Sequence, residues 1–564
     1  MINRIKLEML SRRNQAIVRT RDGGYSLEIG GRSVHSLYSP EKEAARLIED
    51  ILPLEKERTL VIVLGAGLGY HLELLEQNGF TNIIVIERDP EIYGIFKDIY
   101  EFGFVPGIIA PDDPVEKLDS YFTALQIEQF RHIKTLVLRG GYDQESYARF
   151  ENRIERLLKV RLGDFATRLK FEENWFINIL RNINHLDKSA RVGELTAKHL
   201  GAPIVIVSAG PSLKDSVPML REIRDYVFMI AVDTALLVLY EAGIAPDLVY
   251  TLDSQVHNLG DFLMIPRDYM ANIGLVYDLV ANSALPEFFP GKLIAANTAH
   301  LDYDSDGKPF LQKNELVHWM ENIGDIAFGD IETGGSVATS AFHFAFLAGA
   351  APILITGQDL AYSYYASHCS STPHFYRIGR MNNRLVPIMS TFLKVMKSRE
   401  VFLAPGTNGK VYTDFLLNNY KGWFEESAKS ILKNYPGFPL INATANGVII
   451  DGFLRVEQGE LIKQLKKGGK VNKSDFLKPL NLIDGKSIGK ILKGLEGLKE
   501  FVTGLACGES IFETVRTSDF GFLNRYLMRE KVIFERYGNF EKFHIERKLY
   551  RLIKNLEGIF HAAE

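Results

Sequence analysis

The segment 203–213, PIVIVSAGPSL, combines an apolar strand with a turn whose residues can bind an anion. Gly210 lets another group approach the backbone closely, and Pro211 suits the first turn of a helix. Ser212 offers a hydroxyl and an amide at a point where helix N-termini bind phosphates. The segment therefore predicts a phosphate-binding turn between a strand and a helix.

Acidic and hydroxyl side chains follow two further apolar strands. VFMIAVDTAL ends in Asp233-Thr234, and LVYTLDS ends in Asp253-Ser254. Ligands of open parallel sheets bind outside the carboxyl ends of the strands. Polar residues also end strands simply because the following loops are exposed to solvent. Three polar strand ends, one of them Gly-Pro-Ser, nevertheless favour a nucleotide site within residues 201–450.

A second glycine turn, Gly334-Gly335-Ser336, and two histidines, His368 and His374, extend this predicted site. The turn starts a buried helix and is expected to present free amides and a hydroxyl. The strand PILITG follows, and the histidines come shortly after it. A loop imidazole can act as a base or hold a phosphate, although such a residue can also be a plain surface side chain. The site residues predicted here are Gly334, Gly335, Ser336, Gly357, Asp359, Tyr362, His368 and His374.

Another glycine turn, Gly65-Ala66-Gly67-Leu68-Gly69, follows the strand TLVIVL near the start of the chain. Glu87 ends the next strand, about 20 residues on, where an acid can bind ribose hydroxyls. The turn resembles the nucleotide-binding turn of Rossmann-like methyltransferases. A tight turn from strand to helix also needs glycine when no ligand is present, so both interpretations stay open.

Parallel sheets must position these motifs, because apolar strands alternate with helices along the chain. The expected fold class is α/β. We expect a small cap and a Rossmann-like α/β domain over residues 1–170, followed by a helical connector over 171–200. A larger Rossmann-like domain is expected over 201–450, and a mainly helical domain over 451–564.

The composition is that of a soluble globular protein: 46% of the 564 residues are hydrophobic and 24% are charged. A net charge of −4 argues against nucleic acid as the main partner. Cys369 and Cys507 cannot form a disulfide framework, which favours a reducing compartment. No segment reads as a signal peptide or a membrane span, and no motif indicates a divalent metal. We therefore expect a cytoplasmic protein.

Several segments, in order, resemble the motility-associated factor (Maf) proteins. They are GPSL at 210–213, AVDTALLVLYEAGIAPDLVYTLD at 231–253, GGSVATSAF at 334–342 and GQDLAYS at 357–363. HSLYSPEKEA (35–44) and NATANGVIIDG (442–452) extend the resemblance over most of the chain. The family is implicated in moving a nonulosonic acid, of the pseudaminic or legionaminic type, from CMP onto Ser or Thr of flagellin.

The central domain is similar, more distantly, to bacterial sialyltransferases, which bind CMP-sugars in a Rossmann-like fold. The resemblance implies a CMP-sugar donor, no tightly bound cofactor, and flagellin as the acceptor. It places Asp233 where sialyltransferases carry an amide, so this acid is expected to meet ribose or base donors. The other implied roles are Gly210, Pro211 and Ser212 at the CMP phosphate and ribose, Gly335 and Ser336 at the donor, Asp359 and Tyr362 at the sugar or phosphate, and His368 as the base.

Two other functions remain open from the sequence. The core domain also resembles archaeal pterin pyrophosphokinases, which use ATP and Mg²⁺. A chaperone-like flagellin-binding protein without catalysis is the third hypothesis. Ligand-induced stabilisation separates the three functions. CMP should stabilise a glycosyltransferase, ATP with Mg²⁺ should stabilise a pyrophosphokinase, and neither nucleotide should stabilise a chaperone.

Overall fold

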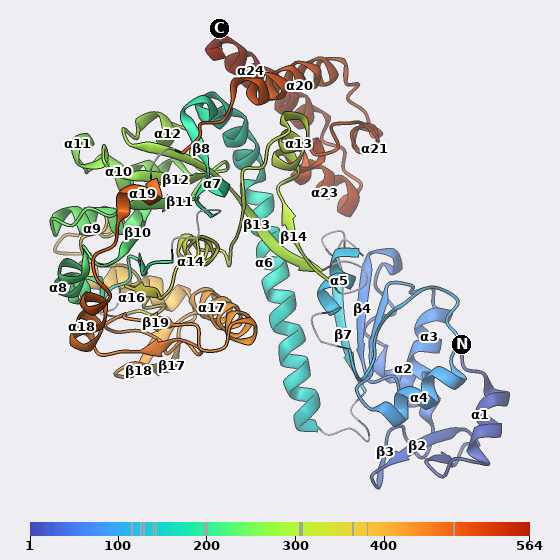
Figure 1. Ribbon diagram of the computed structural model, residues 1–564. Coiled ribbons are helices and arrows are strands. Elements are labelled where there is room, and N and C mark those ends of the chain that lie inside the picture. The colour runs from blue at the N-terminus through green and yellow to red at the C-terminus, as the bar shows by residue number, and fades with distance from the viewer. Residues whose placement is uncertain are drawn as a thin grey trace. The chain divides into compact units, whose positions relative to one another are not determined.

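The computed structural model describes residues 1–113, 117–124, 127, 130–138, 140, 144–196, 201–303, 308–363, 366–380, 382–477 and 480–563. Two compact units make up the chain (Figure 1). The first unit comprises Met1–Lys170, Asp302–Phe310 and Leu527–His544. The second unit comprises Phe171–Leu301, Leu311–Tyr526 and Ile545–Glu564.

The first unit is built on a parallel sheet in the order β6-β5-β4-β7. Its central strand β4 is buried at every position, because helices or loops cover both faces. Side chains alternate between two apolar cores, with Val61 and Val63 in one and Leu60 and Ile62 in the other. The elements are β4 (Thr59–Leu64), α3 (Tyr70–Gln77), β5 (Ile83–Ile86), α4 (Pro90–Ile99), β6 (Gly107–Ile109), α5 (Lys117–Ala124) and β7 (His132–Val137).

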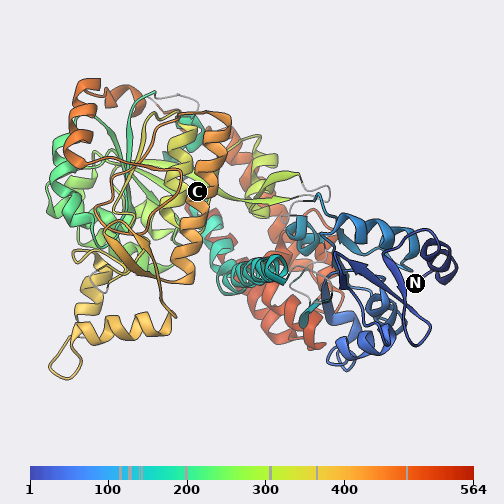
Figure 2. The same ribbon diagram turned by 90° about the horizontal axis from the view of Figure 1, so that it is seen from below.

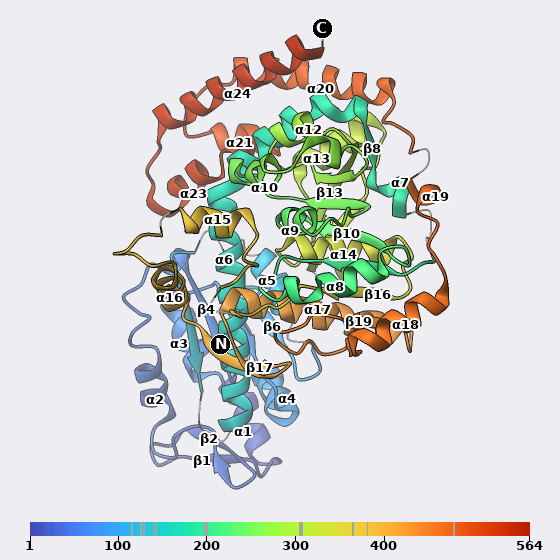
Figure 3. The same ribbon diagram turned by 90° about the vertical axis from the view of Figure 1, so that its left-hand side faces the viewer.

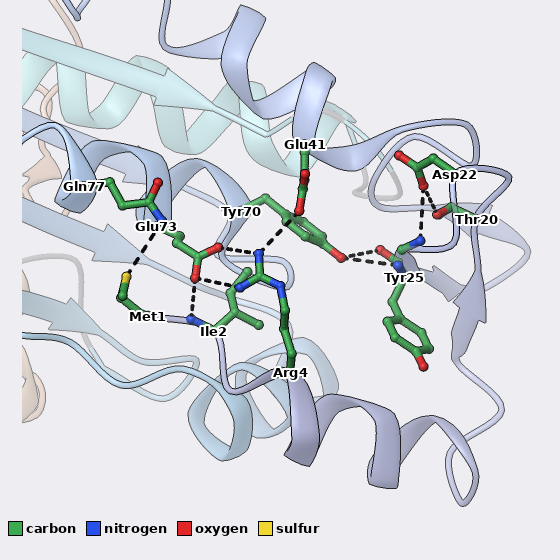
Figure 4. Close-up of polar contacts among 11 residues, drawn as sticks. Met1, Ile2, Arg4, Thr20, Asp22, Tyr25, Glu41, Tyr70, Glu73 and Gln77 are labelled. Carbon is green, nitrogen blue, oxygen red and sulfur yellow. Dashed lines mark hydrogen bonds and ion pairs between the residues drawn. The ribbon is translucent and has the colours of Figure 1, made fainter.

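A small cap precedes this sheet. Its three short strands pair antiparallel in the order β1-β2-β3. The cap consists of α1 (Arg4–Ser11), β1 (Ile17–Arg19), β2 (Tyr25–Ile29), β3 (Arg32–Ser33) and α2 (Pro40–Leu47). Figure 4 shows how Arg4 ties it to α3: the guanidinium group lies between Glu41 and Glu73, and Glu73 also accepts the amide of Ile2 at 3.1 Å.

The second unit holds the larger sheet, in the order β14-β13-β12-β11-β10-β9-β16-β19-β20. Strands β8 and β15 also pair with β13. The strands are β8 (Ser189–Arg191), β9 (Ile204–Val207), β10 (Phe228–Val232), β11 (Leu248–Thr251), β12 (Gly274–Asp278), β13 (Lys292–Tyr303), β14 (Pro309–Lys313), β15 (Asp330–Glu332), β16 (Ile353–Thr356), β19 (Leu440–Asn442) and β20 (Leu454–Arg455).

The strand order of this sheet reverses at β9. From β9 the chain moves outward through β10, β11 and β12 to β13, and it then returns to β16 on the other side of β9. All pairs from β13 to β19 run parallel. The loops after β9 and β16 therefore leave the sheet at a topological switch point, where open α/β sheets bind their ligands.

Helices cover the larger sheet. Helix α14 (Val337–Leu347) contacts β9, β10, β11 and β16, so it lies across one face (Figure 3). The others are α7 (Val192–Thr196), α8 (Leu213–Ile223), α9 (Leu236–Glu241), α10 (Gly260–Leu263), α11 (Arg267–Met270), α12 (Ala284–Phe288), α13 (Glu315–Gly324), α15 (Pro373–Gly379), α16 (Ile388–Ser398) and α17 (Phe415–Asn434). A hairpin, β17 (Phe402–Gly406) with β18 (Gly409–Thr413), forms its own small sheet.

A long helix, α6 (Gln144–Asn182), begins in the first unit and ends in the second. The C-terminal region is helical, as expected from its sequence. It contains α18 (Gln458–Gly468), α19 (Lys473–Leu477), α20 (Gly485–Gly504), α21 (Ile511–Arg516), α22 (Leu523–Tyr526), α23 (Met528–Tyr537) and α24 (Lys542–Ala563). The expected α/β class with a Rossmann-like central sheet is confirmed. No described helix combines enough length and apolar character to cross a membrane.

Candidate functional site

Two glycines bring the loops after β9 and β16 into direct contact at the switch point. The amide of Gly210 donates to the carbonyl of Gly357 at 2.7 Å. A Cβ on Gly210 would overlap that carbonyl and the carboxylate of Asp359. Gly357 has φ +64° and lacks room for a Cβ beside the carbonyl of Ser208. Both glycines are therefore required by the packing of the loops themselves.

Ser212 and Asp359 join the same two loops. The Ser212 amide donates to Oδ2 of Asp359 at 3.0 Å, and the Ser212 hydroxyl donates to Oδ1 at 2.8 Å. The amide of Asn446 donates to the same hydroxyl at 3.2 Å. Ser212 is fully buried, so its hydroxyl and amide are not the free groups that the sequence predicted. Desolvation raises the pKa of the buried Asp359 carboxyl to about 7.

Asp233, at the end of β10, turns its carboxylate inward. Oδ1 accepts the amide of Thr234 at 2.7 Å. Oδ2 accepts the hydroxyl of Thr251 and the amide group of Asn258, both at 2.7 Å. Burial raises the pKa of this carboxyl. Asp233 and Thr234 thus tie together the ends of β10 and β11.

A second buried acid, which no sequence motif indicated, lies close by. Asp261 in α10 is 7% exposed, and its Oδ1 forms no hydrogen bond with a described residue. Burial first, and then the charge of Asp233, raise the pKa of Asp261 to about 8. Asp253, the partly exposed acid after β11, accepts the amide of Gln255 at 2.9 Å. Three carboxyl groups therefore gather beyond the ends of β10 and β11.

The glycine turn before α14 is closed by hydroxyl groups. Thr339 accepts the amides of Gly334 at 2.9 Å and Ser336 at 3.3 Å, and Thr333 accepts the amide of Gly335 at 3.1 Å. Ser336 is the N-cap residue of α14 and accepts the amide of Thr339. The expectation of free amides at Gly334, Gly335 and Ser336 is therefore wrong, because local hydroxyls already bind them.

Tyr362 attaches the loop after β16 to the β17–β18 hairpin. Its amide donates to the carbonyl of Tyr412 at 2.7 Å, and its hydroxyl donates to Oδ2 of Asp414 at 2.7 Å. The side chain is 8% exposed. Tyr362 consequently supports this edge of the site from within the protein.

The two histidines lie side by side, with ring centroids 4.9 Å apart. Burial, then the neighbouring His374, lowers the pKa of His368 to about 4, and Nδ1 of His368 lies 3.0 Å from the hydroxyl of Ser367. The pKa of His374 is also lowered, by burial and by Arg377. Both imidazoles are neutral near pH 7. The next residue, Cys369, donates its amide to the carbonyl of Ala209 at 2.9 Å, which anchors the pair beside the Gly210 turn.

Two asparagines at the end of α6 hold the strand-end loops, and no motif marked them. Asn178 donates to the carbonyls of Ser254 and Val280, both at 3.0 Å. Asn182 donates to the carbonyls of Leu279 at 2.8 Å and Ala281 at 3.0 Å. These contacts hold the loops after β11 and β12 to the end of α6.

The glycine turn of the first unit is occupied by the protein's own side chains. Glu87 accepts the amide of Ala66 at 2.8 Å, and Nε2 of His35 accepts the amide of Leu68 at 2.8 Å. A Cβ on Gly67 would overlap the His35 ring. Because His35 comes from the cap, the cap fills the place where a nucleotide would approach this turn. These contacts favour the interpretation without a ligand.

Among the residues that the structure describes, no group of three or more His, Cys, Asp or Glu side chains can hold a metal ion.

The lysine-rich C-terminal stretch forms ion pairs with acids in α8 and just after it. Lys466 contacts Glu222 at 2.5 Å, and Lys470 contacts Asp225 at 2.7 Å.

Comparison with known proteins relates the chain to two groups. A Maf glycosyltransferase from Magnetospirillum magneticum AMB-1 has a similar structure, with a TM-score of 0.52 at 14% sequence identity, over 97% of this chain and 90% of that one. The resemblance to Maf proteins is thus confirmed at the level of the fold. A family model described as 6-hydroxymethylpterin diphosphokinase MptE-like matches residues 177–364.

Two uncharacterized proteins of Treponema pallidum (strain Nichols) are also similar in sequence. One is 26% identical over 265 residues, which make up 45% of this chain and 43% of that protein. The other is 29% identical over 117 residues, or 21% of this chain and 55% of that protein. The chain therefore spans about half the length of these relatives.

Proposed function

We propose that the protein is a glycosyltransferase that moves a nonulosonic acid, of the pseudaminic or legionaminic type, from its CMP-activated form to Ser or Thr of flagellin. The observation that carries this proposal is the contact between the Gly210-Pro211-Ser212 turn and Asp359 at the switch point, with two neutral histidines beside it. The Maf-like fold supports the same conclusion. Neither Cys369 nor Cys507 forms a disulfide, which fits a reducing, cytoplasmic setting for the reaction.

In the proposed reaction, the acceptor hydroxyl oxygen attacks the anomeric carbon of the donor. The bond between that carbon and the phosphate oxygen breaks, and CMP leaves with the electron pair, so the configuration inverts. A base takes the proton of the acceptor hydroxyl. Positioning and stabilisation of the oxocarbenium-like centre supply the rest of the rate enhancement.

His368 is the proposed base. If its Nδ1–H donates to the hydroxyl of Ser367, the lone pair of Nε2 is available to accept a proton. The pKa of about 4 keeps the imidazole neutral at pH 7. Asp359, which is 1% exposed, is proposed to orient the Ser212 loop; its pKa of about 7 makes it the second candidate for the base.

The donor would lie against the carboxyl ends of β9, β10, β11 and β16. Gly210 and Pro211 are proposed to approach its phosphate and ribose with their backbone, and Gly335 is proposed to lie beside the donor without offering its amide, which Thr333 binds. Thr234 and the partly exposed acid Asp253 would face hydrogen-bond donors of the nucleoside, because carboxylates repel phosphate. The expected contact of Asp233 with ribose or base donors is not part of this proposal, because its buried carboxylate is already bound by Thr234, Thr251 and Asn258. His374 is proposed to contact the phosphate, while Ser212, Gly334, Ser336, Gly357 and Tyr362 hold the surrounding loops.

Intact-mass analysis tests this proposal. Purified protein, CMP-activated pseudaminic or legionaminic acid and unglycosylated flagellin are incubated together. The expected result is flagellin heavier by whole nonulosonic acid residues, with release of CMP. The His368→Ala variant should bind CMP normally and transfer roughly 10²–10⁴-fold more slowly. An unchanged flagellin mass with both donors contradicts the proposal.

A second candidate function rests on the match of residues 177–364 to the MptE-like family model. This function is transfer of a diphosphate group from ATP to a hydroxymethylpterin, with Mg²⁺. A thermal-shift comparison separates the candidates, because a ligand at 100 times its Kd adds about 2.7 kcal/mol of stability. Stabilisation by CMP alone favours the glycosyltransferase, and stabilisation by ATP with Mg²⁺ favours the kinase. A chaperone would respond to neither nucleotide and would still bind flagellin.

A further inference from the structure

A helical arm continues directly from the candidate site. We define the arm as α15, α16 and the β17–β18 hairpin, in the described residues 373–380 and 382–413. His374 lies in the first turn of α15, so the arm starts at the histidine pair. In Figure 2 the golden segment that contains α15 and α16 extends away from the sheet of the second unit.

Exposed apolar side chains line the arm. Leu385 is 90% exposed, and Met389 and Leu393 follow at intervals of four residues with 43% and 50% exposure. In α16 this spacing aligns Met389 and Leu393 along one side of the helix. The helix buries Phe392 and Met396 instead, and Phe392 packs near Phe375 with ring centroids 5.8 Å apart. Helix α16 therefore has two apolar stripes: Phe392 and Met396 are buried, and Met389 and Leu393 are exposed to solvent.

The hairpin adds to this surface. Leu403 and Tyr412 are directly opposite each other in the β17–β18 register, so both side chains lie on the same face. They are 53% and 44% exposed. The backbone carbonyl of Tyr412 accepts the amide of Tyr362, which connects the hairpin to the loop after β16.

The arm carries a charge opposite to that of the chain. Between positions 377 and 412 there are seven Arg and Lys residues and one acid, Glu400, so the segment has a net charge of +6 in a chain of −4. Arg380, Arg384, Lys394 and Lys397 are exposed. Arg377, at the root of the arm, lies near enough to His368 and Asp261 to affect the pKa of both.

We propose that the arm is the docking surface for the protein acceptor, and that it recognises an acidic segment with exposed apolar side chains. The proposal rests on the proposed function. An apolar stripe beside exposed cations matches a partner that offers apolar contacts and carboxylates. Because the arm begins at His374, a polypeptide bound along it can extend to the histidine pair. A patch of basic and apolar residues can also bind an anionic membrane, and the experiment includes this outcome.

Binding of purified flagellin is measured for the full chain and for two double variants. Lys394→Glu with Lys397→Glu reverses two exposed charges, and Leu385→Ser with Leu393→Ser removes two exposed apolar side chains. The expected result for each is a Kd for flagellin at least tenfold higher, with CMP affinity unchanged within twofold. For the wild type, the Kd should rise as salt increases from about 0.05 to 0.3 M.

A matched control reverses two exposed lysines elsewhere in the second unit, Lys463→Glu with Lys467→Glu in α18. This control should bind flagellin within twofold of the wild type. Equal flagellin affinity in the arm variants, or no flagellin binding by the wild type, overturns the proposal. Arm-dependent binding to phosphatidylglycerol vesicles, with flagellin binding unaffected, also overturns it and assigns the arm to lipid.

Transfer assays separate the two proposals. If flagellin binding needs the arm but no sugar is transferred by the wild type, the docking surface stands and the proposed function fails. If sugar is transferred and the KM for flagellin is the same in the arm variants, the proposed function stands and the docking surface fails.

Discussion

The amide and the hydroxyl of Ser212 both donate to the carboxylate of Asp359, at 3.0 and 2.8 Å, although 147 positions separate the two residues in the sequence. This pair fastens the loop after β9 to the loop after β16. The shape of the switch point, and hence of the candidate donor site, depends on it.

Ser212→Ala should destabilise the protein by about 1–3 kcal/mol, because it removes a hydrogen bond from a buried carboxyl group. CMP affinity should fall as well, since the loop loses one of its two bonds to Asp359. Urea unfolding and CMP titration measure the two effects. Ser216→Ala is the matched control, because the Ser216 hydroxyl is buried and has no hydrogen-bond partner among the described residues. An equal effect in both variants would show that the Ser212–Asp359 bond has no special role.

The pH dependence of kcat/KM should identify the base. A base works only when deprotonated, so the rate falls as the pH drops through its pKa. With His368 as the base, at a pKa of about 4, kcat/KM should stay flat from about pH 8 down to about pH 5. With Asp359 as the base, at a pKa of about 7, the rate should fall below pH 7. Circular dichroism at each pH checks that the protein remains folded.

Asp359→Asn should change how stability depends on pH. The folded-state pKa of about 7 lies above the ordinary value of 3.8, so the wild type loses stability as the pH rises between these values. The loss from pH 5.5 to pH 8 is about 2 kcal/mol, and the neutral Asn side chain does not suffer it. The free energy of unfolding of the variant relative to that of the wild type should therefore be higher at pH 8 than at pH 5.5. If the difference in unfolding free energy between the two proteins is the same at pH 5.5 and pH 8, the pKa of Asp359 is not raised, and its carboxylate is better solvated than the structure indicates.

Gly67→Ala should destabilise the protein by about 2 kcal/mol or more, because Gly67 has φ +52° and its Cβ would overlap the His35 ring. Gly94→Ala, inside α4, has open space and an ordinary helical backbone, and should gain about 0.5–1 kcal/mol. Urea unfolding of both variants tests the tight packing of the cap on the turn. A harmless Gly67→Ala substitution would mean that His35 leaves the turn easily, so that a ligand could enter.

Much of the fold follows from local patterns in the sequence. Apolar runs such as PIVIVSAG and VFMIAVD predict buried parallel strands, since a strand covered on both faces needs apolar residues at every position. The glycine turns at Gly65, Gly210 and Gly357 were predicted as the points where strands end. These signals are local, because strand burial and backbone turns depend on residues close together in the chain.

The chemical state of the candidate site was decided by the tertiary structure. Ser212 was predicted to offer a free hydroxyl, but the placement of β16 beside β9 brings Asp359 to it. Asp261 and Asn178 carry no motif, and they matter only because α10 and α6 pack against the strand ends. His35 closes a turn that begins about 30 residues later in the chain. Periodicity indicates which residues are buried, whereas the partner of a buried polar group depends on which strands become neighbours, and local sequence does not specify that.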